Sequence, residues 1–86
     1  MRKEIARIGK NSQEDIIIQL TEFKGIDLVD LRVWVRDGVE TESKPTKKGL
    51  TIKPELLPEL IEALQQAERT YQGARDELNR RHLSES

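Results

Sequence analysis

Cysteine is absent from the 86-residue chain, and histidine, tryptophan, tyrosine and phenylalanine occur once each. The lack of cysteine excludes disulfides and cysteine-based metal sites, and the lone His82 has no second ligand at a usable spacing. No glycine-rich nucleotide loop is present. Asp27 and Asp30 stand three apart in a strand pattern, so they face opposite sides of a sheet. We therefore expect no enzyme, no metal site and no cofactor.

Long hydrophobic runs are also missing. No apolar run approaches the roughly 20 residues of a membrane span, and the first residues lack the apolar segment of a signal peptide. We expect a cytoplasmic protein without membrane contact. Charged residues make up 36% of the chain and apolar residues 35%. Because small domains bury a small share of their surface, this composition favours a core shared between two chains.

The formal net charge is −1, which by itself does not indicate nucleic-acid binding. Its distribution is uneven. Residues 1–53 carry 11 basic and 9 acidic side chains, whereas residues 54–86 carry 4 basic and 7 acidic side chains. Between positions 44 and 53, four lysines follow one another with no acid between them. A local basic stripe of this kind can bind phosphate even when the total charge is near zero.

The first half of the chain reads as four strands. Residues 4–10 form a short candidate, and residues 15–23 are rich in β-branched residues. A Lys-Gly turn leads into residues 26–36, which alternate along their whole length. The polar loop 37–42 carries an Asp-Gly hairpin signal. Residues 44–52 then have a proline near their start, where an edge strand tolerates it. The pattern predicts a four-stranded antiparallel meander.

The second half changes to a helical period. Pro54 suits the first helical position, but Pro58 removes an early hydrogen bond, so we expect the regular helix to start nearer Pro58. Gly73 costs about 1 kcal/mol relative to alanine and would end the packed helix, leaving a looser tail. The organisation predicted is a sheet-plus-helix domain over residues 1–66 and a helical extension over residues 67–86.

Apolar residues along this helix repeat with a spacing of three and four, which is typical of a coiled-coil seam. A helix from residue 55 to about 80 would be roughly 38 Å long, whereas four strands span only roughly 15 to 20 Å. The helix should overhang the sheet, and a second copy of the same helix is the simplest cover. The seam predicts a homodimer interface at Leu57, Leu60, Leu64, Ala67 and Tyr71, continuing to Ala74 and Leu78. The alternative is a short helix ending near Ala67.

Strand alternation sorts the side chains onto two faces. The apolar face carries Ile16, Ile18 and Leu20 from one strand and Val29, Leu31, Val33 and Val35 from the next, and it should lie under the helix. The opposite face carries Phe23, Arg32 and Trp34, and we call it the aromatic face.

Exposed rings beside basic side chains are the parts of a single-strand binding surface, because bases stack on rings while lysine and arginine follow phosphates. The predicted nucleic-acid site consists of Phe23, Lys24, Arg32, Trp34, Lys44, Thr46, Lys47, Lys48 and Gly49, the glycine allowing close backbone approach. An alternative is that the aromatic side chains are dimer contacts and that the lysines only protect a sheet edge.

Several motifs occur together in an order that resembles the positive cofactor 4 family of transcriptional coactivators, in its bacterial form. They are Phe23-Lys24-Gly25, Asp30-Leu31-Arg32 with Trp34, Lys44-Pro45-Thr46-Lys47-Lys48-Gly49, and Pro54-Glu55. The resemblance covers roughly residues 5–66. Eukaryotic members carry basic residues where this chain has Thr21 and Ile26, and Trp34 stands at what resembles their tyrosine position.

The resemblance implies an α+β fold: a curved four-stranded antiparallel sheet followed by one C-terminal helix, dimerised through the helices. It also implies single-stranded DNA binding, largely independent of sequence, in transcription, replication or repair. RNA, or a melted duplex, could occupy the same face, since stacking and phosphate contacts alone do not separate RNA from DNA. A third possibility is a protein-interaction module whose helix and charged tail recruit transcription or replication proteins.

Overall fold

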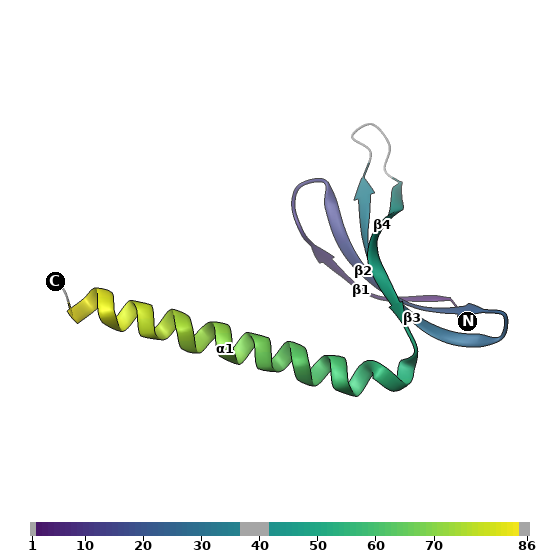
Figure 1. Cartoon of the computed structure of the whole chain (residues 1–86). Helices are drawn as coiled ribbons and strands as arrows, with labels where there is room; N and C mark the ends of the chain where they lie inside the picture. The colour runs from purple at the N-terminus through teal and green to yellow at the C-terminus, as the bar shows by residue number, and fades with distance from the viewer. Residues whose placement is uncertain (1, 37–41, 85–86) are drawn as a thin grey trace. The chain divides into compact units, whose positions relative to one another are not determined.

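The computed structural model describes residues 2–36 and 42–84, with side chains described through Arg81. Four strands run antiparallel in the order β1 (Lys3–Gly9), β2 (Glu14–Phe23), β3 (Ile26–Arg36) and β4 (Ser43–Ile52), as Figure 1 shows. A short 3-10 helix, Pro54–Leu56, is followed by α1 (Leu57–Ser84). The predicted class, an antiparallel meander followed by one C-terminal helix, is confirmed. The chain divides into two compact units, Met1–Glu55 and Leu56–Ser86.

The strand bounds follow the sequence pattern closely. β3 spans the predicted residues 26–36, β2 and β4 each begin one residue earlier than predicted, and β1 is shifted by one residue at both ends. Alternating β-branched residues favour this pleated conformation because their side chains pack well on a sheet surface. Most of the predicted Asp-Gly loop, residues 37–41, lies outside the described residues.

The turn between β1 and β2 is organised by one side chain. Asn11 Oδ1 accepts hydrogen bonds from the backbone N–H groups of Gln13 (2.9 Å) and Glu14 (2.8 Å). The Asn11 amide also donates to Glu14 Oε1 at 2.7 Å. Asparagine favours turns because its short side chain can satisfy nearby backbone groups in this way. The turn thereby fixes where β2 begins.

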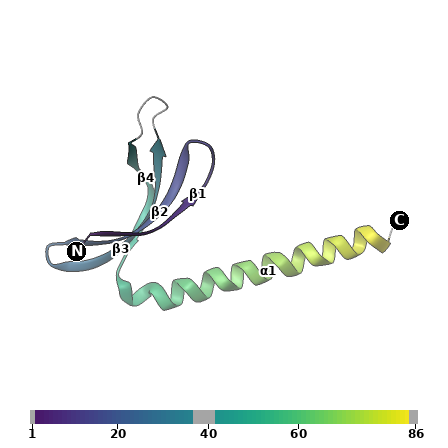
Figure 2. The same ribbon diagram turned by 180° about the vertical axis from the view of Figure 1, so that it is seen from behind.

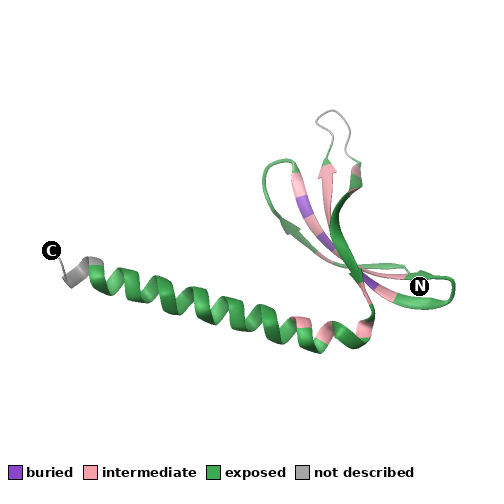
Figure 3. Cartoon of the chain, viewed as in Figure 1, coloured by how far each residue is buried: buried purple, intermediate pink, exposed green. Residues whose placement is uncertain are grey.

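The sheet has a small core. Among the described residues only Ile17 (0% exposed), Val29 (2%) and Asp15 (4%) are buried. Figures 1 and 2 show the strands bending along their length, and the buried positions lie on the two central strands (Figure 3). Most side chains of the apolar face on β2 and β3 are only partly buried. Ile8 and Leu50, which pair with Ile16 and Leu31, are about half-exposed. This sheet face therefore has apolar surface available for further packing.

The helix begins as Pro58 predicts. Residues 54–56 adopt a 3-10 turn and the regular helix starts at Leu57, because proline has no N–H to donate within the first turn. Gly73 does not interrupt the helix, and α1 continues to Ser84. A single glycine cost of about 1 kcal/mol is small beside the many good helix formers around it.

The helix is exposed along almost its whole length (Figure 3). Leu64, Tyr71 and Leu78 on the predicted seam are 58%, 59% and 64% exposed. No stretch of helix in the described chain is both long and apolar enough to span a bilayer. A helix with this much exposed apolar surface needs a partner surface to gain stability from packing.

Candidate nucleic-acid interface

The tip of the β2–β3 hairpin presents an aromatic ring and a cation together. The two turn residues have positive φ, 52° at Lys24 and 79° at Gly25, as the tight primed hairpin turns require. Glycine adopts this conformation freely, but a side chain in it costs roughly 1–2 kcal/mol. Phe23 is 62% exposed, and Lys24 Nζ lies 5.3 Å from its ring centroid, within cation–π range. The strained turn thus presents an exposed ring with an ammonium beside it.

Strand register places Phe23, Arg32 and Trp34 on one face, as predicted. Ile17 pairs with Arg32, and Asp15 pairs with Trp34. Residues directly opposite in an antiparallel pair share a face, so alternate positions up to Phe23 share the face of Arg32 and Trp34. Phe23 pairs with Ile26, eight residues before Trp34, which corresponds to about 26 Å of strand. The two rings therefore lie at opposite ends of the aromatic face and would serve different nucleotides.

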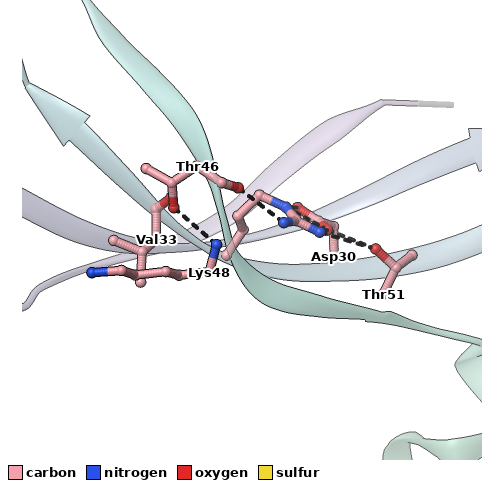
Figure 4. A network of polar contacts seen from close by, with 6 residues as sticks. Asp30, Val33, Thr46, Lys48 and Thr51 are labelled. Carbon is pink, nitrogen blue, oxygen red and sulfur yellow. Dashed lines mark hydrogen bonds and ion pairs between the residues drawn. The ribbon is translucent and has the colours of Figure 1, made fainter.

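Arg32, predicted to contact phosphate, is held by neighbouring protein groups. Its Nη2 lies 3.0 Å from Asp30 Oδ1, and its Nη1 donates to the Thr46 carbonyl at 2.9 Å. Thr51 Oγ1 donates to the same Asp30 oxygen at 2.8 Å (Figure 4). The Arg32 side chain is only 22% exposed, and its charge is offset by Asp30. Its main role in this structure is to link β3 to β4 through the hydrogen bond to the Thr46 carbonyl.

A bulge in β4 is the second feature that this network holds. Arg32 pairs with Gly49 and Trp34 with Pro45, so residues 46–48 stand opposite Val33 alone. Thr46 Oγ1 donates to the Val33 carbonyl at 2.7 Å and accepts from the Lys48 backbone N–H at 3.2 Å (Figure 4). Bulges bend a strand and re-aim its side chains. The bulge, residues 46–48, carries both lysines of the predicted Lys-Lys pair.

Gly49 has a structural reason to be glycine. A Cβ built at this position would contact the Leu31 carbonyl oxygen and lie 2.7 Å from Arg32 Cα. The backbone that approaches Gly49 closely is therefore that of β3. The packing of β4 against β3 therefore requires glycine at this position.

The lysines predicted to follow phosphates are exposed. Within the described chain, Lys44 and Lys47 form no ion pair. Lys44 pairs with Val35, so register assigns it to the apolar face. The alternation predicted for Lys44, Thr46 and Lys48 is interrupted by the bulge, since these residues no longer follow a regular pleat. Lys47 in the bulge thus has charge available for an anionic ligand.

A hollow of about 410 Å³ opens on the aromatic face. Its walls combine the rings of Trp34 and Pro45 with polar side chains from β2, β3 and the residue before β1. The indole Nε1 of Trp34 is buried and has no hydrogen-bond partner among the described residues. An unpaired buried donor costs about 1–3 kcal/mol. The hollow is lined by Arg2, Gln19, Thr21, Asp30, Arg32, Trp34 and Pro45.

Sequence reasoning missed three parts of this site. Arg2 and Gln19 line the hollow, but neither belongs to a motif; alternation placed Gln19 on the aromatic face without indicating a role. The third part is buried Asp15, which lies 3.5 Å from Arg7 Nη1 and 3.4 Å from Arg36 Nη2. This cluster joins three strands. Only strand pairing, which brings the distant positions together, could have revealed it.

The Glu14 carboxyl, next to Asp15 in the sequence, has a lowered pKa. The hydrogen bond from Asn11 lowers the pKa of the Glu14 carboxyl, and the charges of Lys10 and Lys48 lower it further. Lys10 Nζ lies 3.6 Å from Glu14 Oε1. Glu14 consequently stays ionised at neutral pH and offsets part of the local positive charge.

Comparison with known proteins identifies the family to which this four-stranded sheet and C-terminal helix belong. The family model described as Transcriptional Coactivator p15 (PC4) matches residues 10–63. This is more than half of the chain, which therefore belongs to that family.

Relatives agree with this assignment. The RNA polymerase II transcriptional coactivator SUB1 of Saccharomyces cerevisiae is 33% identical over 54 residues, which cover 63% of this chain and 17% of the yeast protein. The chain thus spans about a sixth of that relative's length.

Two crystal forms of BPSL1147, a PC4 homolog from Burkholderia pseudomallei K96243, have the same fold. The tetragonal form is 34% identical, with a TM-score of 0.72 over 79% of this chain and 98% of that chain. The orthorhombic form is 35% identical, with a TM-score of 0.74 over 79% of this chain and 90% of that chain.

Proposed function

We propose that the protein is a homodimeric single-stranded DNA-binding protein, largely independent of sequence, that acts in transcription, with replication and repair as further settings. The exposed Phe23 ring with Lys24 beside it carries the proposal. An exposed ring beside an ammonium group contributes little to packing of the protein core. The same arrangement suits a single strand, because the ring can stack on a base while the ammonium contacts the neighbouring phosphate. Family membership supports the same conclusion.

Binding in this account needs no bond to be made or broken. Phe23 and Trp34 would stack on bases at the two ends of the aromatic face, each stack contributing about 1–3 kcal/mol. Lys47 and Lys48, carried by the β4 bulge, would contact phosphates. Arg32 would support the bulge through its bond to the Thr46 carbonyl while contributing little net charge, because Asp30 pairs with it.

The second copy in the proposal is supported by exposed apolar surface. The sheet contains two fully buried apolar side chains among the described residues, Ile17 and Val29, which is a small core for a chain of this length. The helix seam meanwhile exposes more than half of Leu64, Tyr71 and Leu78. Pairing of two copies through this seam would bury both sets of leucines. Light scattering should then give twice the chain mass of 9.9 kDa, and a mass of one chain would exclude the dimer.

The DNA-binding part is tested by titrating labelled oligo-dT of about 20 nucleotides and a duplex of the same length at two salt concentrations. The proposal predicts much tighter binding of the single strand, and an affinity for it that falls as salt rises. Phe23→Ala should weaken binding by about ten-fold or more, the value of one stacked base. Ile8→Ala, which shortens a half-exposed side chain on the apolar face, is the matched control and should bind nearly as the unmodified protein. Equal binding of strand and duplex, or none at low salt, would overturn the proposal.

A further inference from the structure

The helix carries an apolar seam beyond the residues that the family model matches. That match ends at residue 63, whereas α1 continues to Ser84. The three large side chains of this later seam are more than half exposed. They need a cover that the matched residues do not identify. The seam positions, spaced by three and four residues, are Leu64, Ala67, Tyr71, Ala74 and Leu78.

Large and small side chains alternate along this seam. The large residues share one heptad position, and the two alanines share the other. In a parallel pair of helices each position meets its own copy, so Ala67 would face Ala67 and Tyr71 would face Tyr71. In an antiparallel pair the two positions face each other, so a large residue meets a small one. Facing residues that alternate in size interdigitate without gaps. The seam therefore favours an antiparallel pair.

Two charged residues beside the seam indicate the register. Glu68 and Arg75 occupy the same flanking position, one heptad apart, and neither forms an ion pair within the described chain. Arg75 Nη1 donates to the Tyr71 hydroxyl at 3.4 Å, so its side chain lies beside the seam. Flanking positions of this kind face each other in an antiparallel pair, so Glu68 would meet Arg75 of the second copy, twice by symmetry. Sliding by one heptad in either direction would instead place Glu68 against Glu68 or Arg75 against Arg75, and like charges repel.

A hollow on the helix surface supports this contact. Its volume is about 220 Å³, and it is lined by Ile61, Leu64, Gln65 and Glu68. An apolar surface with a carboxylate beside it suits an arginine, because the stem of arginine is apolar and its end is charged. The hollow lies on the side of the seam that Arg75 of the second copy would face.

We propose that residues 64–81 pair with the same residues of a second copy as an antiparallel coiled coil, in which Glu68 binds Arg75 of the second copy. The inference rests on the proposed homodimer and assigns an orientation and a register to its helices. Charge complementarity along the seam selects a second copy as the partner, because the same chain supplies both members of the ion pair.

The register assigns a partner to each seam position. The central layers join Tyr71 to Ala74 and Ala67 to Leu78. At each end, Leu64 covers the apolar part of the last seam residue, Arg81. The guanidinium of Arg81 is itself paired with Glu77, at 3.2 Å.

Crosslinking of the full chain tests the register, because the chain contains no cysteine. Ala67→Cys and Leu78→Cys chains are treated with a short thiol crosslinker, each alone and as a mixture after subunit exchange. The antiparallel register predicts crosslinks between the two variants in the mixture. Each variant alone should crosslink poorly, since its two cysteines would lie roughly 16 Å apart along the helix axis. Efficient crosslinking of each variant with itself would indicate parallel helices and overturn the inference.

Charge reversal provides a second readout, the dimer dissociation constant from analytical ultracentrifugation. Glu68→Arg should weaken the dimer by about ten-fold, because two modest attractive pairs become repulsive. Arg75→Glu should have a similar effect, and the double variant Glu68→Arg/Arg75→Glu should restore the original affinity. Glu62→Arg is the matched control. It makes the same change of charge on the helix face opposite the seam and should leave the dimer unchanged.

The outcomes separate this inference from the function on which it rests. A mass of two chains without crosslinks between the Ala67→Cys and Leu78→Cys variants would show that the copies pair elsewhere, which overturns the inference and leaves the homodimer intact. A double charge variant as weak as the single variants would refute the contact between Glu68 and Arg75. A mass of one chain would overturn the homodimer itself, and the oligo-dT titration then tests strand binding separately.

Discussion

Replacing Thr46 by valine should weaken DNA binding without changing any charge. The hydroxyl of Thr46 makes two hydrogen bonds in the β4 bulge, to the Val33 carbonyl at 2.7 Å and from the Lys48 N–H at 3.2 Å. Valine has a similar shape but leaves both backbone groups unpaired. Because this region is only partly buried, we expect a stability loss of about 1–2 kcal/mol.

The effect on binding follows from the lysines that the bulge carries. If Thr46→Val loosens residues 46–48, Lys47 and Lys48 must be ordered when DNA binds, at a cost of about 0.5–1.5 kcal/mol for each immobilised side chain. The two side chains together would cost about 1–3 kcal/mol, so affinity for oligo-dT should fall by about five-fold or more at fixed salt. The number of phosphates neutralised would not change, so the slope of log affinity against log salt should be retained.

Thermal unfolding and anisotropy titration on the same samples measure both effects. Thr51→Val is the matched control: it also removes a hydroxyl, one that bonds Asp30, but leaves both bulge hydrogen bonds in place. A Thr46→Val protein that is less stable yet binds oligo-dT normally would refute the idea that the bulge positions the lysines. So would an equal loss of affinity in both variants.

Four further predictions test separate parts of the structure. The double variant Lys47→Ala/Lys48→Ala should reduce the single-strand salt slope by about 1.4, two contacts at about 0.7 each, as measured by titration at several salt concentrations. Gly49→Ala should lower the unfolding temperature, since its Cβ would meet β3 backbone. Leu64→Glu should halve the mass found by light scattering, because each chain would place one carboxylate in the apolar interface between the two helices. Because folding lowers the pKa of Glu14, its ionised form stabilises the fold above the pKa of the unfolded state, and this stabilisation is lost as pH falls through the lower pKa of the folded state. In Glu14→Gln, the urea midpoint should therefore decline less over that acid range.

Much of the fold was readable from local pattern. Alternation gave β3 its bounds, and the missing N–H of Pro58 accounts for the late start of the regular helix. The positions of Phe23 and Lys24 were predictable because they are adjacent in sequence, at the end of a strand and in the tight turn that follows it. These features depend on interactions between residues close in sequence.

The parts that escaped prediction depend on register between strands. The bulge arises because Thr46 bonds across to Val33, and the neutralisation of Arg32 needs Asp30 and Thr51 on two strands. Alternation along β3 places Asp30 beside Arg32 on one face, but it carries no information about the partners on β4. A charge that looks free in the sequence can therefore be paired in the structure, as Arg32 shows.

The central claim is that bases of a single strand lie on the aromatic face. It is tested most directly by photocrosslinking oligo-dT carrying 5-iodouracil at successive positions, followed by mass spectrometry of the linked peptides. The account predicts crosslinks at Phe23 and Trp34, from nucleotides that are not adjacent in the strand. Crosslinks confined to the helix or to the apolar face would contradict it.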